Sequence, residues 1–365
     1  MRVLFDIIDT GWSTTKVWGN LLPHVASDTR IDLTVMLGGS LGCQLLRTHL
    51  QNESLSCVRR FPWPDFQPAL VRWQIEDMLT VCHGWSRTVD VFHSSTVRIP
   101  TFGNWKKIAT IHDTVRELFP DEFGAANRGI MRMRRNVVKR CDGIMTISEY
   151  SKKCIVSIFN IDPDKVFVSH LAANKLALLP YQNLVNINRK LPTKPYILYV
   201  GTRSGYKNFG ALANAVSINS NSREFTVVAI GGGELTDIEK TRLKKLGILD
   251  KIQVFNDVSE DFLQVAYKKA LALVYPSRME GYGLPIIEAQ AAGCPVIASN
   301  AGPLPEVAGR GALFFDPDDY GNISLLFNTV SNPTVRESLA RAGYMNLGRF
   351  TWQKSRDAVI RMYEA

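Results

Sequence analysis

The sequence predicts an α/β protein of two doubly wound domains, each with a parallel sheet covered by helices on both faces. The 365 residues, 45% of them hydrophobic, can bury two cores. Short apolar runs typical of buried strands alternate with helical stretches, as in βαβ units. An irregular segment at 171–195 contains three prolines and interrupts the alternation, which indicates the connection between the domains.

Each domain is expected to contain its own set of strands. In the first half the apolar runs cover 1–9, 31–37, 89–93, 108–112, 143–148 and 166–170, with helices expected at 17–25, 68–81, 130–140 and 149–159. In the second half they cover 196–200, 225–230, 251–255, 271–275, 295–299 and 313–315, and a last helix is expected to end near 363.

Composition excludes some classes of protein. The sequence contains no run of 18 apolar residues, the length needed to span a membrane. The acids within 1–9 favour a first strand over a signal peptide. The six cysteines form no Cys-x-x-Cys pair and the six histidines are scattered, so we expect reduced thiols and no metal site. The net charge of +9 lies mostly in the first half, which favours an anionic partner.

The most informative stretch is 277–288, which follows the apolar run 271–275 and leads into a good helix-forming segment. Pro285 suits the first position of a helix, which is expected to begin at about Leu284. The amides of Tyr282, Gly283 and Leu284 would then face a ligand above the helix end, and glycine lets an anion approach closely. The predicted site also contains two acids, Glu280 in the loop and Glu288 in the first helical turn.

These two acids are expected to accept hydrogen bonds from two sets of hydroxyls on one ligand, as a sugar nucleotide offers. Each feature alone is also ordinary structure, because acids suit first helical turns and glycines suit turns after strands. With seven residues between them, around Gly-Tyr-Gly-Leu-Pro, Glu280 and Glu288 resemble the paired-glutamate motif of the family 4 retaining glycosyltransferases, also described as glycosyl transferases group 1. The resemblance continues through 291–299 and 305–309.

This resemblance implies the GT-B fold, two Rossmann-like domains facing across a cleft. Residues 1–185 would form the acceptor-side domain, together with the C-terminal helix at 350–365 packing back on it. Residues 186–349 would form the domain that binds the nucleotide sugar. Between strand and helix, the loop at 201–208 carries Arg203 and Lys207, and two cations in one crevice suit a diphosphate. In the resembling family a basic pair in this loop binds the diphosphate, and Lys207 is the closer match.

Two loops of the first half are further candidates. His112 follows a strand; alone it is equally consistent with a buried structural role, whereas the resemblance implies that it borders the reacting carbon of the donor sugar. His93 has a similar placement. The first loop is glycine-rich in the resembling family, and here Gly11, Thr14 and Thr15 are candidates for contacting phosphate or acceptor.

The resemblance thus predicts a retaining, metal-independent hexosyltransferase. It would move a sugar, with mannose from a GDP-sugar as the first choice, from a nucleoside-diphosphate donor to a glycan or lipid-linked acceptor in bacterial surface polysaccharide or lipopolysaccharide assembly. Catalytic roles fall to His112 and Glu280, and no cofactor is expected. The expected location is the cytoplasm, with peripheral contact between basic residues and the inner face of the membrane.

Two other readings stay open. A basic nucleic-acid-binding protein would use the charge of the first half, but no recognition motif accompanies it, so nucleic acid is not the expected partner. A non-catalytic nucleotide-sugar-binding subunit would keep the fold without turnover. Substitution of Glu280 separates that subunit from an enzyme, because only an enzyme loses a transfer rate.

Overall fold

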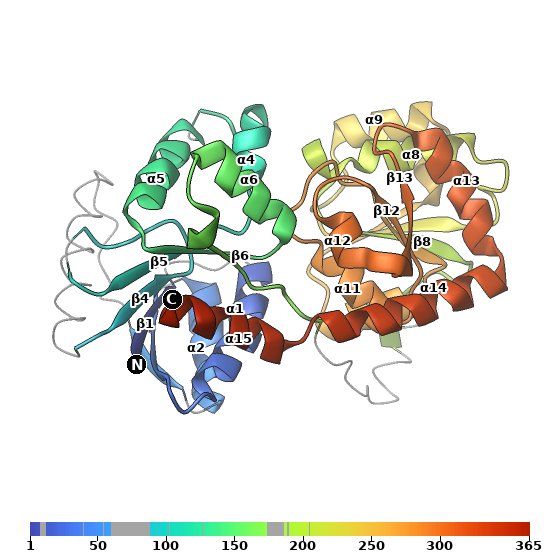
Figure 1. Ribbon diagram of the computed structural model, residues 1–365. Helices are drawn as coiled ribbons and strands as arrows, with labels where there is room; N and C mark the ends of the chain where they lie inside the picture. The colour runs from blue at the N-terminus through green and yellow to red at the C-terminus, as the bar shows by residue number, and fades with distance from the viewer. Residues whose placement is uncertain are drawn as a thin grey trace. The chain divides into compact units, whose positions relative to one another are not determined.

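A computed structural model describes two compact units (Figure 1). Unit 1 comprises Met1–Leu171 and Trp352–Ala365, and unit 2 comprises Ala172–Thr351. The described residues are 1–7, 12–38, 40–53, 55–59, 88–101, 103–125, 127–173, 186–187, 190–203 and 205–365. The predicted domain boundary at 185 borders a stretch outside these residues and stays a prediction.

Unit 1 contains a parallel sheet of seven strands in the order β3-β2-β1-β4-β5-β6-β7. Every strand pair is parallel, and Phe5 lies opposite Val35 on one side and His93 on the other. Because the chain winds outward in both directions from β1 and β4, the order reverses between these two strands. The strands are β1 (Arg2–Ile7), β2 (Asp32–Leu37), β3 (Ser56–Arg59), β4 (Val91–Ser94), β5 (Lys106–Thr110), β6 (Gly143–Thr146) and β7 (Val166–Val168).

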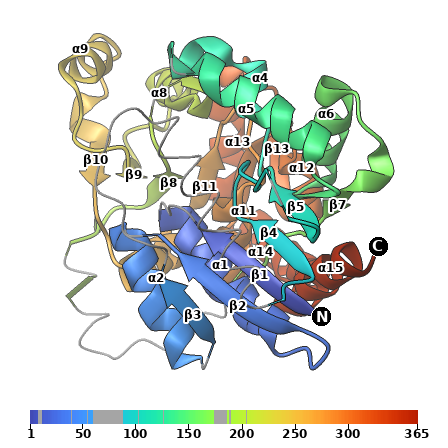
Figure 2. The ribbon, with the colours of Figure 1, turned by 90° about the vertical axis from the view of Figure 1, so that its left-hand side faces the viewer.

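Helices cover both faces of this sheet (Figures 1 and 2). α1 packs against α2 and α15 on one face, whereas α5 and α6 cover the other. There, Val137 and Ile155 pack with Ile144 in one apolar cluster. The helices are α1 (Trp12–Ala26), α2 (Leu41–Asn52), α4 (Val115–Leu118), α5 (Asn127–Arg140), α6 (Glu149–Phe159) and α15 (Trp352–Glu364).

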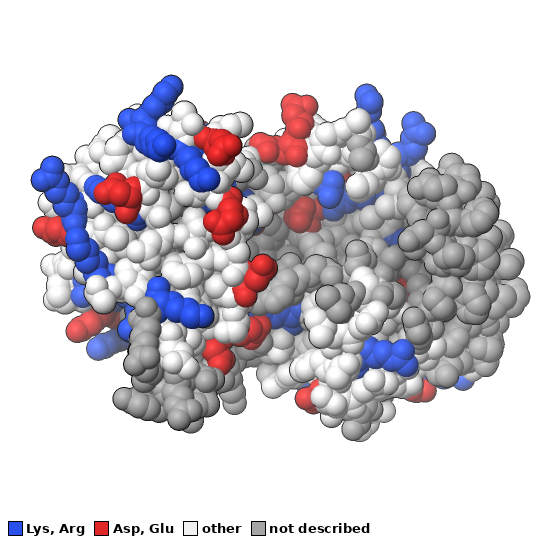
Figure 3. Space-filling view, turned by 180° about the vertical axis from the view of Figure 1, so that it is seen from behind, with Lys and Arg blue, Asp and Glu red and all other residues white. Residues whose placement is uncertain are grey.

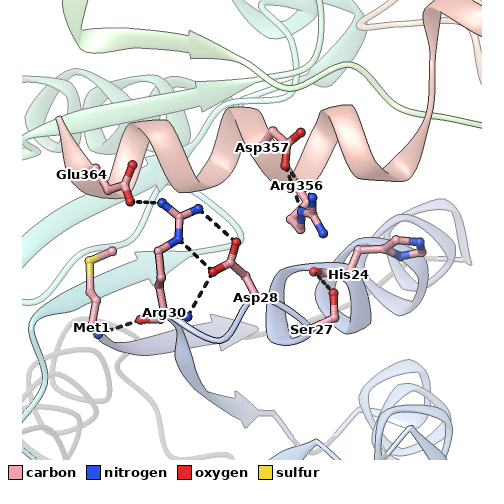
Figure 4. A network of polar contacts seen from close by, with 8 residues as sticks. All are labelled: Met1, His24, Ser27, Asp28, Arg30, Arg356, Asp357 and Glu364. Carbon is pink, nitrogen blue, oxygen red and sulfur yellow. Dashed lines mark hydrogen bonds and ion pairs between the residues drawn. The ribbon is translucent and has the colours of Figure 1, made fainter.

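The C-terminal helix α15 is part of unit 1 and is joined to it by buried and exposed polar contacts. His93 lies between Tyr363 of α15 and Thr110, with Nδ1 2.7 Å from the tyrosine hydroxyl and Nε2 3.0 Å from Thr110 Oγ1. Complete burial lowers the pKa of His93 to about 3, so it is a neutral structural residue. At the surface Arg30 pairs with Glu364 at 2.6 Å (Figure 4).

Unit 2 contains a second parallel sheet, in the order β10-β9-β8-β11-β12-β13. Its order reverses between β8 and β11, where Ile197 lies opposite Ala272. The strands are β8 (Tyr196–Val200), β9 (Thr226–Ile230), β10 (Ile252–Phe255), β11 (Ala272–Tyr275), β12 (Val296–Ser299) and β13 (Ala312–Phe315).

Two groups of helices cover the second sheet. α8 packs against α13 on one face, over a core that includes Leu212, Val274 and Phe327, while α11 packs against α10 and α14 on the other. The helices are α8 (Phe209–Ile218), α9 (Asp237–Lys245), α10 (Glu260–Lys269), α11 (Leu284–Ala291), α12 (Leu304–Ala308), α13 (Tyr320–Ser331) and α14 (Pro333–Asn346).

The predicted fold class is confirmed, since both units are doubly wound α/β structures with parallel sheets. The strand run at 196–200 and the helix at 149–159 match the observed elements residue for residue. The sequence missed α2 and β3. The helix expected at 68–81 lies outside the described residues.

The described surface and side chains add three findings. On the face in Figure 3, Lys and Arg side chains lie among Asp and Glu side chains. The described cysteines, Cys43, Cys57, Cys141, Cys154 and Cys294, are not in disulfides, while Cys82 is not described. Within the described ranges, no helix is both long and apolar enough to cross a bilayer.

Candidate functional site

The candidate site of unit 2 lies where the order of its strands reverses. In doubly wound sheets the two loops that leave the strands flanking this point diverge and leave a crevice for ligands. Here the two strands are β8 and β11, and the loops after them carry Lys207 and Glu280 respectively. Both residues were predicted from sequence, and the structure brings them into direct contact.

Lys207 and Glu280 form a two-pronged ion pair. The Lys207 Nζ atom lies 2.7 Å from Glu280 Oε1 and 2.8 Å from Oε2, and the exposed fractions of the side chains are 18% and 10%. The ammonium also lies 5.4 Å from the ring centre of Tyr206 and 5.8 Å from that of Tyr275. Aromatic faces and a carboxylate together hold the cation in a part-buried position.

Asn208 fixes the loop that carries Lys207. Its backbone adopts the left-handed conformation, with φ 57°, which asparagine tolerates better than most residues. Its side-chain amide donates to the carbonyls of Pro276, at 3.1 Å, and Pro317, at 2.8 Å. These bonds tie the loop after β8 to the loops after β11 and β13, so the position of Lys207 is set by three strand ends.

Arg203 binds the neighbouring loop of its own unit. Its guanidinium donates to the carbonyls of Gly231, Gly233 and Glu234 at 2.7–2.9 Å and to Glu239 Oε1 at 2.9 Å. Its side chain is 2% exposed. The structure therefore gives Arg203 a role in holding the glycine turn after β9, and its proposed contact with a diphosphate stays a prediction.

Helix α11 begins at Leu284, as predicted, with Pro285 as its second residue. Gly283 precedes it with φ 106°, and a Cβ atom there would lie 2.9 Å from Leu304 Cδ2, so both the backbone and the space require glycine. Glu288 is the fifth residue of α11, so its predicted place in the first turn was wrong by one residue.

Glu280 and Glu288 each form a hydrogen bond with a buried tyrosine. The Tyr267 hydroxyl on α10 donates to Glu288 Oε2 at 3.0 Å, and the hydroxyl of Tyr275 on β11 hydrogen bonds to Glu280. Burial and the nearby carboxylates raise the pKa of both phenols well above 10, so both remain donors at neutral pH. Tyr282, also predicted, is buried and packs edge-on against Phe350 with ring centres 6.1 Å apart.

His112 lies in unit 1, two residues after β5, at the carboxyl edge of the sheet. It borders a cavity of about 180 Å³ lined by Ser95, Thr96, Val97, Thr110, Ile111, Asp113, Arg116, Ile130 and Arg134. Its ring centre is 5.8 Å from that of Trp18, and its Nε2 atom is buried with no hydrogen-bond partner in the described part of the chain. Burial lowers the pKa of His112, and the nearby Asp113 opposes this shift only in part, so the imidazole is neutral.

The remaining candidates are only partly described. Gly11 lies outside the described residues, and Thr14 is described in its backbone alone, within α1. Thr15 lies in the first turn of the same helix. Among the described residues, no group of three or more His, Cys, Asp and Glu side chains could hold a metal ion, and metal independence stays a prediction.

Sequence reasoning missed Tyr267 and Tyr275, the two tyrosines that bond to the glutamates. Tyr275 had a signal, because it is the last residue of an apolar strand and directly precedes the site loop. Tyr267 had none, since a tyrosine on the buried side of a helix is common and its partner lies 21 residues away.

Comparisons with known proteins relate this chain to a family by sequence and to solved structures by fold. Residues 181–345 match the sequence profile of the family described as glycosyl transferases group 1. O-antigen chain mannosyltransferase RfbU of Salmonella typhimurium is 31% identical over 234 residues, which are 60% of this chain and 63% of that relative. O-antigen chain mannosyltransferase B of Escherichia coli is 28% identical over 269 residues, 71% of this chain and 70% of its own length. The chain thus spans less than two thirds of RfbU.

Solved structures share the fold over the whole chain. HepE of Anabaena in complex with UDP and glucose has a TM-score of 0.76 at 16% identity, with 100% of both chains covered. WaaG, a glycosyltransferase involved in lipopolysaccharide biosynthesis, has a TM-score of 0.69 at 13% identity, with 98% of this chain and 99% of WaaG covered. Residues 181–345 therefore form a domain of the glycosyl transferases group 1 family, and the chain has the GT-B fold of the glycosyltransferases.

Proposed function

We propose that this chain is a retaining, metal-independent hexosyltransferase that uses a nucleoside-diphosphate sugar. The proposed donor is a GDP-sugar, with mannose as its sugar, and the proposed acceptor is a glycan or lipid-linked glycan of a bacterial surface polysaccharide. The names of the relatives support this choice, since RfbU and the E. coli protein are both O-antigen chain mannosyltransferases. The complex of HepE with UDP and glucose supports a nucleotide-sugar donor.

The Lys207–Glu280 pair is the observation that carries the proposal. An ammonium held at the divergence of two strand-end loops can bind the diphosphate and stabilise its growing charge as the glycosidic bond breaks. Glu280 beside it can accept hydrogen bonds from the sugar hydroxyls. In the structure Lys207 and Glu280 bind each other. A donor would instead offer its diphosphate to Lys207 and its sugar hydroxyls to Glu280.

The α11 amides would complete the donor site of unit 2, and His112 is the candidate of unit 1 for contact with a sugar. A neutral imidazole can accept or donate a hydrogen bond at the donor sugar, and backbone amides at a helix end favour phosphate. Glu288 would bind the ribose hydroxyls. No metal is needed when a lysine and a helix end carry the charge of the leaving group, which then accepts the acceptor's proton on the same face of the sugar.

The proposal predicts that Glu280→Gln lowers the rate of transfer about 100-fold or more while nucleoside-diphosphate binding is retained. The substitution removes an acceptor of sugar hydroxyls but leaves Lys207 to bind phosphate. Calorimetric titration with GDP, UDP, dTDP and ADP, each with and without its sugar, first identifies the base. Radiolabelled transfer to a lipid-linked glycan then measures the rate, and NMR of the product gives the anomeric configuration.

Asp318→Asn is the matched control, because Asp318 also pairs with the site loop, through Arg278, but at the surface. Its transfer rate should stay within about twofold of wild type, as for most surface changes. Binding of a nucleotide sugar with no transfer or hydrolysis in the wild type would favour the non-catalytic subunit. An inverted product would refute the retaining mechanism.

We also propose that helix α5 rests on an anionic membrane. Arg128, Arg132, Arg135 and Lys139 are exposed and recur every three or four residues, so they share one face of the helix. The helix contains no Asp or Glu. A one-sided basic helix is typical of peripheral contact with anionic lipid.

Reversing Arg132 and Arg135 to Glu is expected to weaken binding to phosphatidylglycerol vesicles about tenfold or more, since each basic residue near such a surface contributes about 1 kcal/mol. Co-sedimentation with these vesicles and with neutral phosphatidylcholine vesicles measures the effect. Lys240→Glu with Lys244→Glu on α9 makes the same change of net charge elsewhere and should bind like wild type. Equal losses in the two pairs would mean that net charge alone, and not α5, determines binding.

A further inference from the structure

Tyr267 makes the hydrogen bond that holds Glu288, the second glutamate of the Glu280 and Glu288 motif. It lies on α10, is 2% exposed, and its hydroxyl donates to Glu288 Oε2 at 3.0 Å. α10 and α11 pack against each other, so the bond joins two neighbouring helices. A phenol buried this deeply keeps its proton at neutral pH, and its only strong donor is directed at a carboxylate.

A hydrogen bond of this kind restricts the glutamate. An unrestrained glutamate samples many rotamers, and fixing them when a ligand binds costs free energy. The Tyr267 bond restrains the Glu288 carboxylate before any ligand arrives. Such preorganisation increases affinity only for the ligand groups that the carboxylate itself contacts.

We propose that Tyr267 is a positioning residue that holds Glu288 in the orientation in which it binds the ribose hydroxyls of the donor nucleotide. The role rests on the proposed function, because it requires a nucleotide in unit 2. It makes a narrow prediction: loss of the Tyr267 hydroxyl weakens recognition of the ribose and leaves the contacts to base and diphosphate in place.

The test compares the dissociation constants of a ribonucleoside diphosphate and its 2′,3′-dideoxy analogue, with the base that the wild-type protein prefers. Wild type should prefer the ribonucleotide, and Tyr267→Phe should reduce this preference about tenfold, the effect of one hydrogen bond to a charged group. In Glu288→Gln the preference should be small already, and adding Tyr267→Phe should change it by less than about twofold, because the two residues act through one contact.

Tyr196→Phe is the matched control. Tyr196 is a buried tyrosine of the same unit. Its hydroxyl donates at 2.7 Å to the carbonyl of Ala266, which precedes Tyr267 in the chain, and so its partner is a carbonyl and not a carboxylate. This variant loses an equivalent buried bond and should keep the full ribose preference. Hydrogen exchange of α10 and α11 checks that each variant is folded.

The outcomes separate the two proposals. If Tyr267→Phe weakens both ligands equally, or if Tyr196→Phe loses the same preference, Tyr267 is structural and the inference is overturned while the donor site stands. If wild type binds the nucleotide without a ribose preference, the proposed roles of Glu288 and Tyr267 are both refuted. If wild type binds no nucleoside diphosphate at all, the proposed function itself is refuted.

Discussion

Lys207→Met is expected to weaken binding of the preferred nucleoside diphosphate, and of its sugar, about 100-fold or more. Truncating one partner of a poorly exposed charge pair costs about 2–5 kcal/mol, and here the lost cation is the one positioned for the diphosphate. Because the leaving-group charge grows in the transition state, the rate of transfer should fall further than ground-state affinity. Isothermal titration measures the affinity, and single-turnover transfer measures the rate.

The same substitution should also destabilise unit 2, because Glu280 is left in a poorly exposed position without its cation. The expected loss is about 1–3 kcal/mol. Adding Glu280→Gln should restore most of the stability but none of the affinity. All seven tryptophans of the sequence fall in unit 1, so hydrogen exchange of β8 and β11 is the suitable probe for unit 2.

Lys251→Met is the matched control for this experiment. Lys251 is a second part-buried lysine of unit 2, with its Nζ atom 2.8 Å from Ser222 Oγ, and it lies just before β10 at the opposite end of the sheet from the site loops. Its loss should leave nucleotide binding within about twofold of wild type. If both lysine variants weaken binding equally, general charge attraction explains the affinity and the diphosphate role of Lys207 is wrong.

The sequence could predict that Lys207 and Glu280 approach each other, because both follow strands of one parallel sheet. It could not predict their ion pair, because the contact joins residues 73 positions apart and depends on how two loops are tied together by Asn208. The contacts of Arg203 could not be predicted from its sequence position either. Its place after β8 indicated a phosphate ligand, but its contacts are set by the path of the loop after β9, which sequence pattern does not determine.

The fold was easier to predict than the contacts within it, since a buried parallel strand leaves a continuous apolar run, as at 196–200. β3 was missed because it has only two apolar residues, which lie between Ser56 and Arg59 at its ends. The start of α11 at Leu284 was predicted correctly, but Glu288 is its fifth residue and therefore lies just beyond a first turn of 3.6 residues.

Arg134→Met is expected to cost unit 1 about 3–5 kcal/mol of unfolding free energy, because it leaves a buried carboxylate without its cation. Arg134 and Glu117 pair at 2.8 Å with side chains only 6% and 4% exposed, and the guanidinium also donates to the Asp113 carbonyl beside His112. Urea unfolding followed by tryptophan fluorescence measures unit 1. Arg135→Met, the next residue of α5 but exposed, should cost less than about 0.5 kcal/mol.

The deficit of Arg134→Met should also depend on pH in a defined direction. Burial raises the pKa of Glu117 above its ordinary value of 4.5, and Arg134 opposes that rise. Removing Arg134 raises the folded-state pKa further. The contribution of Glu117 to the stability of the variant is therefore greatest below pH 4.5, where the carboxyl is protonated in both states, and it is lost as pH rises through the folded pKa. The difference from wild type should therefore be smaller at pH 4 than at pH 7.5, and Glu117→Gln in the same background should remove this dependence. A deficit that is constant with pH would instead mean that Arg134 stabilises unit 1 by packing and by its bond to Asp113, and not by neutralising Glu117.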